Sequence, residues 1–146
     1  MPIKVLAIDD DSDMTELVAI LLGKHSFEVI TANNGTDGIE ATKNESPDIV
    51  ILDLLMPEVD GWAVCRSLRT FSQIPIIILS AIDNPGSVGS ALDAGADDYL
   101  IKPVPTGVLV AHINNLARRA IAQRDSLPIG TQTAPLAAQD SWASGD

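Results

Sequence analysis

The sequence predicts an α/β fold, a three-layer sandwich in which helices cover both faces of a five-stranded parallel sheet. Short apolar runs of the kind found in strands alternate five times with longer stretches that have helical spacing of apolar residues. Strands that alternate with helices pair in parallel through right-handed crossovers, which places the helices on both faces of the sheet.

The strands are the short apolar runs. They are predicted, in chain order, at residues 5–8, 27–32, 49–52, 76–79 and 99–101. The third and fourth runs contain no polar residue, which is typical of central strands whose two faces are both buried under helices.

The helices are predicted between and after the strands, at residues 14–22, 36–44, 62–71, 84 to about 95, and 105 to about 124. The first has apolar residues three and four apart, and Asp11 or Ser12 can cap its amino end. The second has Ile39 as its main apolar anchor. Asn84 and Pro85 provide a capping residue and a first-turn proline for the fourth.

Composition limits the class of protein. A chain of 146 residues suits one domain with a short appendage, and its net charge of -11 disfavours direct binding to nucleic acid. One cysteine, Cys65, allows no internal disulfide and is interpreted as a small buried hydrophobe. Neither a signal-peptide pattern nor a membrane-length apolar run is present, so we expect a cytoplasmic protein that does not enter membranes.

The composition changes after residue 124. Residues 125–146 contain proline, glycine and serine but no lysine or arginine, which predicts a flexible tail or the stub of a linker. Trp142 is the one residue of this segment that could dock on another surface. Residues 1–124 are therefore expected to form the folded domain.

Polar side chains follow four of the predicted strands: Asp9, Asp10 and Asp11 the first, Asp53 the third, Ser80 the fourth, and Lys102 the fifth. Sheets of this kind carry their functional site at the carboxyl ends of the strands, so these side chains should meet. Clustered carboxylates need a compensating cation, and Mg²⁺ prefers their oxygens. A carboxylate can also attack phosphorus, and the phosphoryl group then needs countercharges such as Lys102 and a hydrogen-bond donor such as Ser80.

These strand ends resemble those of bacterial two-component response-regulator receiver domains. The matching stretches are residues 7–11, 49–57 with 60–61, 76–81 and 95–103, within a similarity that spans roughly residues 3 to 122. Each stretch alone is weak evidence, but all of them in order, each at a predicted strand end, form a specific signal. The resemblance implies the flavodoxin-like strand order 2-1-3-4-5.

The resemblance also implies a role for each site residue. Asp53 would be the phosphoacceptor, and Mg²⁺ would be held by Asp9, Asp10, Asp53 and the backbone carbonyl of Leu55. Ser80 and Lys102 would bind the phosphoryl oxygens, and Tyr99 would swing inward as Ser80 moves toward the phosphate. The Lys102–Pro103 bond would be cis, which X-Pro bonds tolerate.

The implied function is a phosphorylation switch. A sensor histidine kinase or phosphotransfer protein would supply the phosphoryl group, and the Tyr99 face would then bind a downstream effector protein or an output domain missing from this chain. The domain would be a monomer or a phosphorylation-dependent dimer. Its own chemistry would be limited to self-phosphorylation and slow self-dephosphorylation, so it is not expected to be an enzyme.

Two alternatives have a different chemistry. In a haloacid-dehalogenase-like phosphatase, Asp9 would be the nucleophile and Asp11 the acid/base, but cap insertions are absent and residues 53–57 would be unexplained. A flavodoxin-like electron carrier would need a hydroxyl- and glycine-rich phosphate loop after the first strand. His25 and His112 lie at no predicted strand end and are interpreted as surface residues, and Asp11 as a helix cap.

The chain departs from the family pattern in two places. Leu55 and Ile82 stand where family members often carry polar residues that help orient the hydrolytic water, which predicts a long-lived phosphoryl state. The winged-helix subgroup usually has an acid near Val108 and an arginine at His112, and both are missing, so a dimer through that face is not expected. Arg118 and Arg119 do fit the subgroup.

Overall fold

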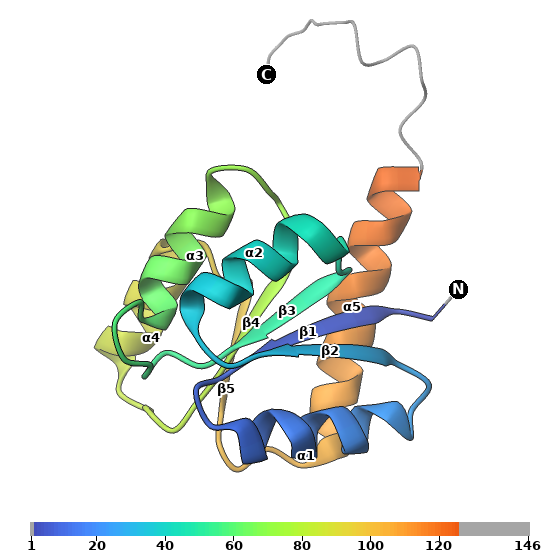
Figure 1. Ribbon diagram of the computed structural model, residues 1–146, viewed down its shortest axis with the longest axis horizontal. Coiled ribbons are helices and arrows are strands. Elements are labelled where there is room, and N and C mark those ends of the chain that lie inside the picture. Colours follow the sequence, from blue (N-terminus) through green and yellow to red (C-terminus); the bar gives the residue numbers. More distant parts are fainter. Residues whose placement is uncertain (1, 126–146) are drawn as a thin grey trace, which may run out of the picture.

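The computed structural model describes residues 2–125, in which five strands and five helices alternate along the chain (Figure 1). The strands are β1 (Lys4–Ile8), β2 (Glu28–Ala32), β3 (Ile49–Leu52), β4 (Ile76–Ser80) and β5 (Asp98–Ile101). The helices are α1 (Ser12–Gly23), α2 (Gly35–Glu45), α3 (Gly61–Arg69), α4 (Pro85–Asp93) and α5 (Thr106–Asp125). Every predicted element is present, with its ends displaced by a residue or two.

The last helix ends one residue later than predicted. Asp125 is the last residue of α5, whereas the sequence pattern indicated an end at about residue 124. The rest of the predicted tail, Trp142 included, lies outside the described residues. Within residues 2–125, no helix combines the length and the apolar character needed to cross a membrane.

The five strands form one parallel sheet in the order β2-β1-β3-β4-β5, which confirms the predicted architecture. Successive crossovers run in opposite directions from β1, so the strand order reverses between β1 and β3. In open α/β sheets, ligands bind outside the carboxyl ends of the strands at such a reversal. Ile8 at the end of β1 pairs with Leu52 at the end of β3. The residues that follow these two strands therefore emerge side by side.

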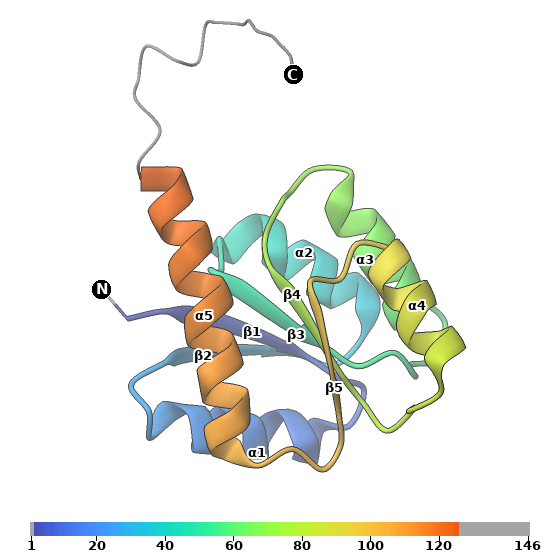
Figure 2. The same cartoon turned by 180° about the vertical axis from the view of Figure 1, so that it is seen from behind.

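Two apolar cores lie on opposite faces of the sheet. Helices α2, α3 and α4 cover one face, and α1 and α5 cover the other (Figures 1 and 2). Neighbouring strand residues point to opposite faces, so Val50 and Leu52 enter the first core while Ile49 and Ile51 enter the second. This two-sided burial explains why the central strands contain no polar residue.

Short polar side chains begin the helices that border the site. Asp11 caps α1 by accepting hydrogen bonds from the amides of Asp13 and Met14. Asp60 caps α3, and Asn84 caps α4 with Pro85 in its first turn, as predicted. Asp11 therefore has the structural role expected for it.

Cys65 has the role that its sequence context predicted. Its side chain is fully buried in α3, and burial raises the pKa of its thiol to about 11. The thiol therefore stays protonated near neutral pH and behaves as a packing group.

Gly61, directly after the Asp60 cap, lets α3 approach the loop that follows β3. A Cβ atom at this position would lie 2.4 Å from the carbonyl oxygen of Asp53 and 2.6 Å from the Cα of Leu54. Both are backbone atoms that cannot rotate away, so we expect Gly61→Ala to lower the free energy of unfolding by about 3 kcal/mol. Urea unfolding measures this change.

Gly89→Ala is the matched control, because Gly89 is exposed in α4 and a Cβ atom there would meet nothing within 4 Å. Alanine favours a helix over glycine, so the control should be stabilised slightly. Equal urea midpoints for the two variants would contradict the close approach at Gly61.

Candidate phosphoacceptor and metal site

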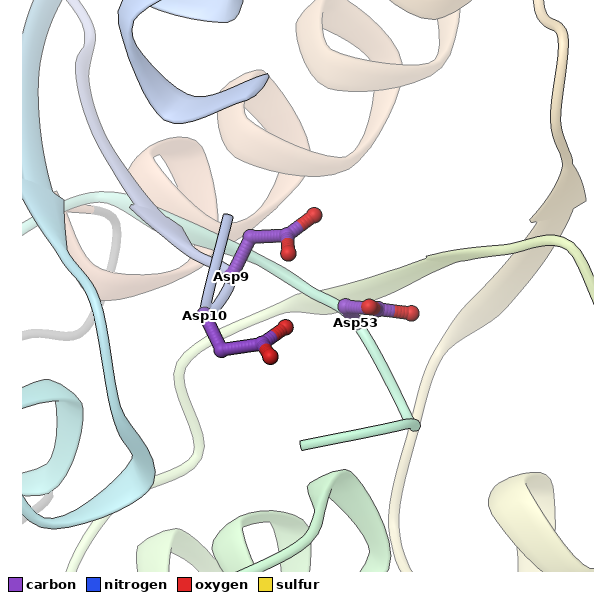
Figure 3. Close-up of side chains that lie close together, drawn as sticks. All are labelled: Asp9, Asp10 and Asp53. Atoms are coloured by element: carbon purple, nitrogen blue, oxygen red, sulfur yellow. The ribbon is translucent and has the colours of Figure 1, made fainter. Parts of the chain in front are cut away.

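Three aspartates meet at the carboxyl edge of the sheet (Figure 3). Asp9 and Asp10 follow β1, and Asp53 follows β3. The amide of Asp53 donates to the carbonyl of Ile8 at 3.0 Å, which extends the pairing of the two strands into the loops. One carboxylate oxygen from each aspartate lies within 4.8 Å of the other two, so the predicted cluster is present.

The carboxylate of Asp9 is buried between two partners. Its side chain is 10% exposed, and one oxygen accepts a hydrogen bond from the amide of Asp11 at 3.0 Å. The other oxygen lies 3.2 Å from Nζ of Lys102, which follows β5 on the far side of the site. Lys102 is therefore brought to the aspartates, as the strand-end rule predicted.

Asp53 lies in an environment that disfavours its negative charge. Burial raises the pKa of its carboxyl above the ordinary value of 3.8. The ammonium of Lys102 and backbone hydrogen bonds from Leu55 and Leu54 act in the opposite direction, while the Asp9 carboxylate raises the pKa further. The net shift is upward, and burial is its largest cause. Separately, the cluster joins three carboxylates with the single ammonium of Lys102, so it carries a formal excess of negative charge.

This donor set fits Mg²⁺. The ion is a hard cation that binds one or two carboxylates, keeps several waters and accepts phosphate oxygens. Three converging carboxylates with a residual negative charge match that preference. Leu55, whose backbone carbonyl is the fourth predicted ligand, lies two residues after Asp53 in the exposed part of the loop.

The raised pKa of Asp53 predicts how stability depends on pH. The Asp53 carboxyl loses its proton less readily in the folded protein than in the unfolded chain, so its ionisation favours unfolding. The free energy of unfolding therefore falls as pH rises from 3.8 through the pKa of the folded state. We therefore expect Asp53→Asn to be more stable than the wild type at pH 7 without Mg²⁺. Thermal unfolding should show the difference disappearing below about pH 4 and shrinking when Mg²⁺ is added.

Asp83→Asn removes the same charge from an exposed residue of the loop after β4 and serves as the control. At pH 7 it should unfold at the same temperature as the wild type. A wild type that is more stable than Asp53→Asn at pH 7 would contradict the charge imbalance.

Ser80 and Tyr99 both form hydrogen bonds with the backbone of the same residue, Ile82. Ser80 is fully buried at the end of β4, and its Oγ accepts a hydrogen bond from the amide of Ile82 at 3.2 Å. The hydroxyl of Tyr99 donates to the carbonyl of Ile82 at 2.6 Å. The sequence analysis selected Ile82 for its aliphatic side chain. No sequence signal indicated that its backbone amide and carbonyl would connect Ser80 with Tyr99.

The two departures from the family pattern occupy different environments. The side chain of Leu55 is among the exposed large hydrophobics, at 57% of its surface. That of Ile82 is partly buried and packs against the core under α2, α3 and α4. Leu55 is thus free to meet solvent beside the site, whereas Ile82 is held partly by the core. The Lys102–Pro103 bond is cis, as the resemblance implied.

The two histidines differ from each other. His25 is exposed, as predicted, but His112 is half-buried on α5 with its Nδ1 2.5 Å from a carboxylate oxygen of Asp98. Nothing in the sequence indicated this pair, because the two residues belong to different elements and are brought together by the packing of α5 beside β5. Asp98 directly precedes Tyr99, so the pair borders the predicted switch.

Comparison with known proteins decides the family. The family model for the response regulator receiver domain matches residues 5–114. The chain belongs to this family. Receiver domains are signalling modules, generally not enzymes, and they generally bind Mg²⁺ at an acidic pocket, which the three aspartates provide here.

Similar proteins include a transcriptional regulatory protein and a response regulator. The chain is 40% identical to the transcriptional regulatory protein AfsQ1 of Streptomyces coelicolor, over 82% of this chain and 52% of that protein. It is also 40% identical to the response regulator MprA of a Mycobacterium species, with the same two coverages. The chain spans about half the length of the curated relatives it matches.

Solved receiver domains share its fold. The BeF3-activated receiver domain of RstA from Klebsiella pneumoniae is 36% identical and superposes with a TM-score of 0.76 over 79% of this chain and 98% of that one. A two-component response regulator from Clostridium difficile is 30% identical, with a TM-score of 0.77 over 80% and 97% of the two chains. The receiver fold predicted from the sequence is therefore confirmed.

Membership in this family also bears on the phosphatase alternative. That hypothesis assigned Asp11 as an acid/base, but the Asp11 carboxylate accepts hydrogen bonds from two amides at the start of α1. The residue that joins Asp9 and Asp10 is Asp53, which follows the central strand β3 and is the residue that the phosphatase alternative left unexplained.

Proposed function

We propose that this chain is the phosphoacceptor receiver of a two-component phosphorelay and accepts a phosphoryl group on Asp53. The donor is a sensor histidine kinase or a phosphotransfer protein. The observation that carries this proposal is the convergence of Asp53 with Asp9 and Asp10 at the strand-order reversal, with Lys102 3.2 Å from Asp9. Such a set can hold a divalent cation and compensate the charge of a phosphoryl group.

The chemistry is a transfer between two atoms. An oxygen of the Asp53 carboxylate forms a bond to phosphorus, while the bond from phosphorus to the donor atom breaks and its electron pair leaves with the donor. Lys102 offsets the charge on the phosphoryl oxygens, and the hydroxyl of Ser80 donates a hydrogen bond to one of them. Asp9, Asp10, Asp53 and the Leu55 carbonyl would hold Mg²⁺, which would supply further positive charge near the phosphoryl oxygens.

The switch follows from the hydrogen bonds around Ile82. When Ser80 turns toward the phosphoryl group, its Oγ loses the hydrogen bond from the amide of Ile82. The loop after β4 is then free to move, and with it the Ile82 carbonyl that accepts the Tyr99 hydroxyl. Tyr99 then moves inward. Phosphorylation shifts a pre-existing equilibrium between two arrangements of this loop and of the Tyr99 face, and partner binding changes with it.

Labelling with a small phosphodonor, followed by mapping of the modified residue, tests the proposal. The label should require Mg²⁺ and map to Asp53 alone. A label on Asp9 would overturn the receiver chemistry and favour a nucleophile of the phosphatase type.

The aliphatic residues beside the site predict a slow loss of the phosphoryl group. In-line attack needs an oriented water, and Leu55, which is 57% exposed, offers it no hydrogen bond. We expect the double variant Leu55→Asn, Ile82→Glu to lose its phosphoryl group about tenfold faster than the wild type, measured as decay of the labelled protein. Equal decay rates would show that these residues do not set the lifetime.

The separate Leu55→Asn variant is the informative control. Ile82 packs partly against the core, so most of the acceleration should come from Leu55. A single variant with the wild-type rate, beside a fast double variant, would assign the effect to position 82 instead.

The output of the switch is a downstream effector protein or an output domain. The Asp98 carboxylate already contacts His112 of the same chain, and Val108 and His112 replace the charged pair of the winged-helix subgroup. We therefore propose that the Tyr99 face binds a different protein and does not pair with a second copy. Location in the cytoplasm remains a prediction from the sequence.

A further inference from the structure

A groove of about 650 Å³ lies at the edge of the sheet opposite the aspartates. It is bounded by the end of α2, by the loop that leads into β4, and by the last turns of α5. Phe71 lines it with 43% of its surface exposed, and Nζ of Lys43 lies 5.0 Å from the centroid of the Phe71 ring. An exposed aromatic ring beside a cation is a suitable contact for another aromatic side chain.

The chain leaves its last helix beside this groove. Four residues of α5 line it, at positions 120, 121, 123 and 124, so the lining face of the helix includes its final turn. Twenty-one residues follow Asp125. Their sequence contains two aspartates, Asp140 and Asp146, no lysine or arginine, and one aromatic residue, Trp142.

We propose that the groove binds this carboxyl-terminal segment of the same chain, with Trp142 seated against Phe71 and Lys43. The indole and the Phe71 ring form an aromatic pair, and the Lys43 ammonium contacts both the indole face and the nearby Asp140 carboxylate. Two basic residues, Lys43 and Arg124, line the groove against one acid, Asp48, so its charge complements the two aspartates of the segment.

Because the segment is covalently attached to α5, even a weak interaction with the groove would keep the groove mostly occupied. Sixteen residues lie between Asp125 and Trp142, which allows a reach of up to about 55 Å. A short linker of this kind holds its end at an effective concentration on the order of 1 mM, so an intrinsic dissociation constant of a few hundred micromolar already leaves the groove mostly occupied. The groove and Asp53 lie at opposite edges of the sheet, so this contact does not depend on the proposed phosphorylation.

The test is a comparison of backbone amide spectra of the full chain with and without Trp142→Ala. The substitution should shift amides of residues 42–48, 71–75 and 120–124, and the shifts should be unchanged by tenfold dilution. Shifts confined to residues 126–146 would overturn the proposal. Shifts that vary with dilution would overturn it as well, because a second copy would then fill the groove.

Charge reversal at the groove provides the matched pair of variants. Lys43→Glu should move the Trp142 indole N–H signal to the position it has in a free peptide of residues 126–146. Lys24→Glu makes the same change at an exposed residue after α1, outside the groove, and should leave the signal in place. An indole signal that already matches the free peptide in the wild type would also overturn the proposal.

Discussion

Asp53→Asn is expected to abolish labelling by a small phosphodonor, by a factor on the order of 10³ or more. The amide group is nearly the same size as the carboxyl group but its oxygen is a poor nucleophile, so no acyl phosphate forms at position 53. Removing this half-buried carboxylate should not unfold the domain, because burial raises the pKa of Asp53 and so makes its charge unfavourable in the folded state. The label is measured by intact mass and then mapped.

Two controls separate this loss from a general effect of charge or fold. Asp83→Asn changes an exposed residue near the same edge of the sheet and should be labelled like the wild type. Asp10→Asn keeps the nucleophile but removes a predicted metal ligand, so its labelling should recover at raised Mg²⁺ concentration. Wild-type labelling in Asp53→Asn would show that another residue is the phosphoacceptor.

Lys102→Ala and Ser80→Ala should each disconnect the site from the Tyr99 face while still binding Mg²⁺. In the wild type, a phosphate mimic should shift the amide signals of α4, β5 and α5. Neither variant should show those shifts, because Lys102 and Ser80 are the side chains proposed to contact the phosphoryl oxygens. Lys102→Ala should bind Mg²⁺ at least as tightly as the wild type, since the ammonium that now lies 3.2 Å from Asp9 is gone.

Matched variants at exposed positions test the specificity of this result. Lys43→Ala and Ser90→Ala remove the same groups from α2 and α4 and should retain the full response to the mimic. A full wild-type shift in both Lys102→Ala and Ser80→Ala would exclude them from the switch, and loss of Mg²⁺ binding would assign them to the metal site instead.

The elements of this fold could be predicted because their signals are local. Each strand is a short apolar run, and the two-sided burial of β3 and β4 leaves no room for a polar residue in them. Asp11 and Asn84 start their helices with side chains that bond amides two or three residues away. The ends of α3 and α4 were predicted less well, about two residues too late in each case, because the last turn of a helix depends on what it packs against.

The aspartate cluster could also be predicted, since parallel strands bring their carboxyl ends to one edge whatever the loops do. Pairing of Ile8 with Leu52 is enough to place Asp9 beside Asp53. The strand order itself came from the resemblance to a family and not from any pattern of apolar residues.

Only the tertiary structure decided which side chains and backbone groups around the site are in contact. The hydrogen bonds of Ser80 and Tyr99 to the two backbone groups of Ile82, the contact of His112 with Asp98, and the upward pKa shift of Asp53 have no signal in the sequence. Each depends on loop paths, side-chain rotamers and burial shared by segments far apart in the chain. The sequence by itself determined the elements and the residue types at the site, because periodicity and capping act over a few residues; distances of 3 Å between separate segments arise only once the whole domain packs.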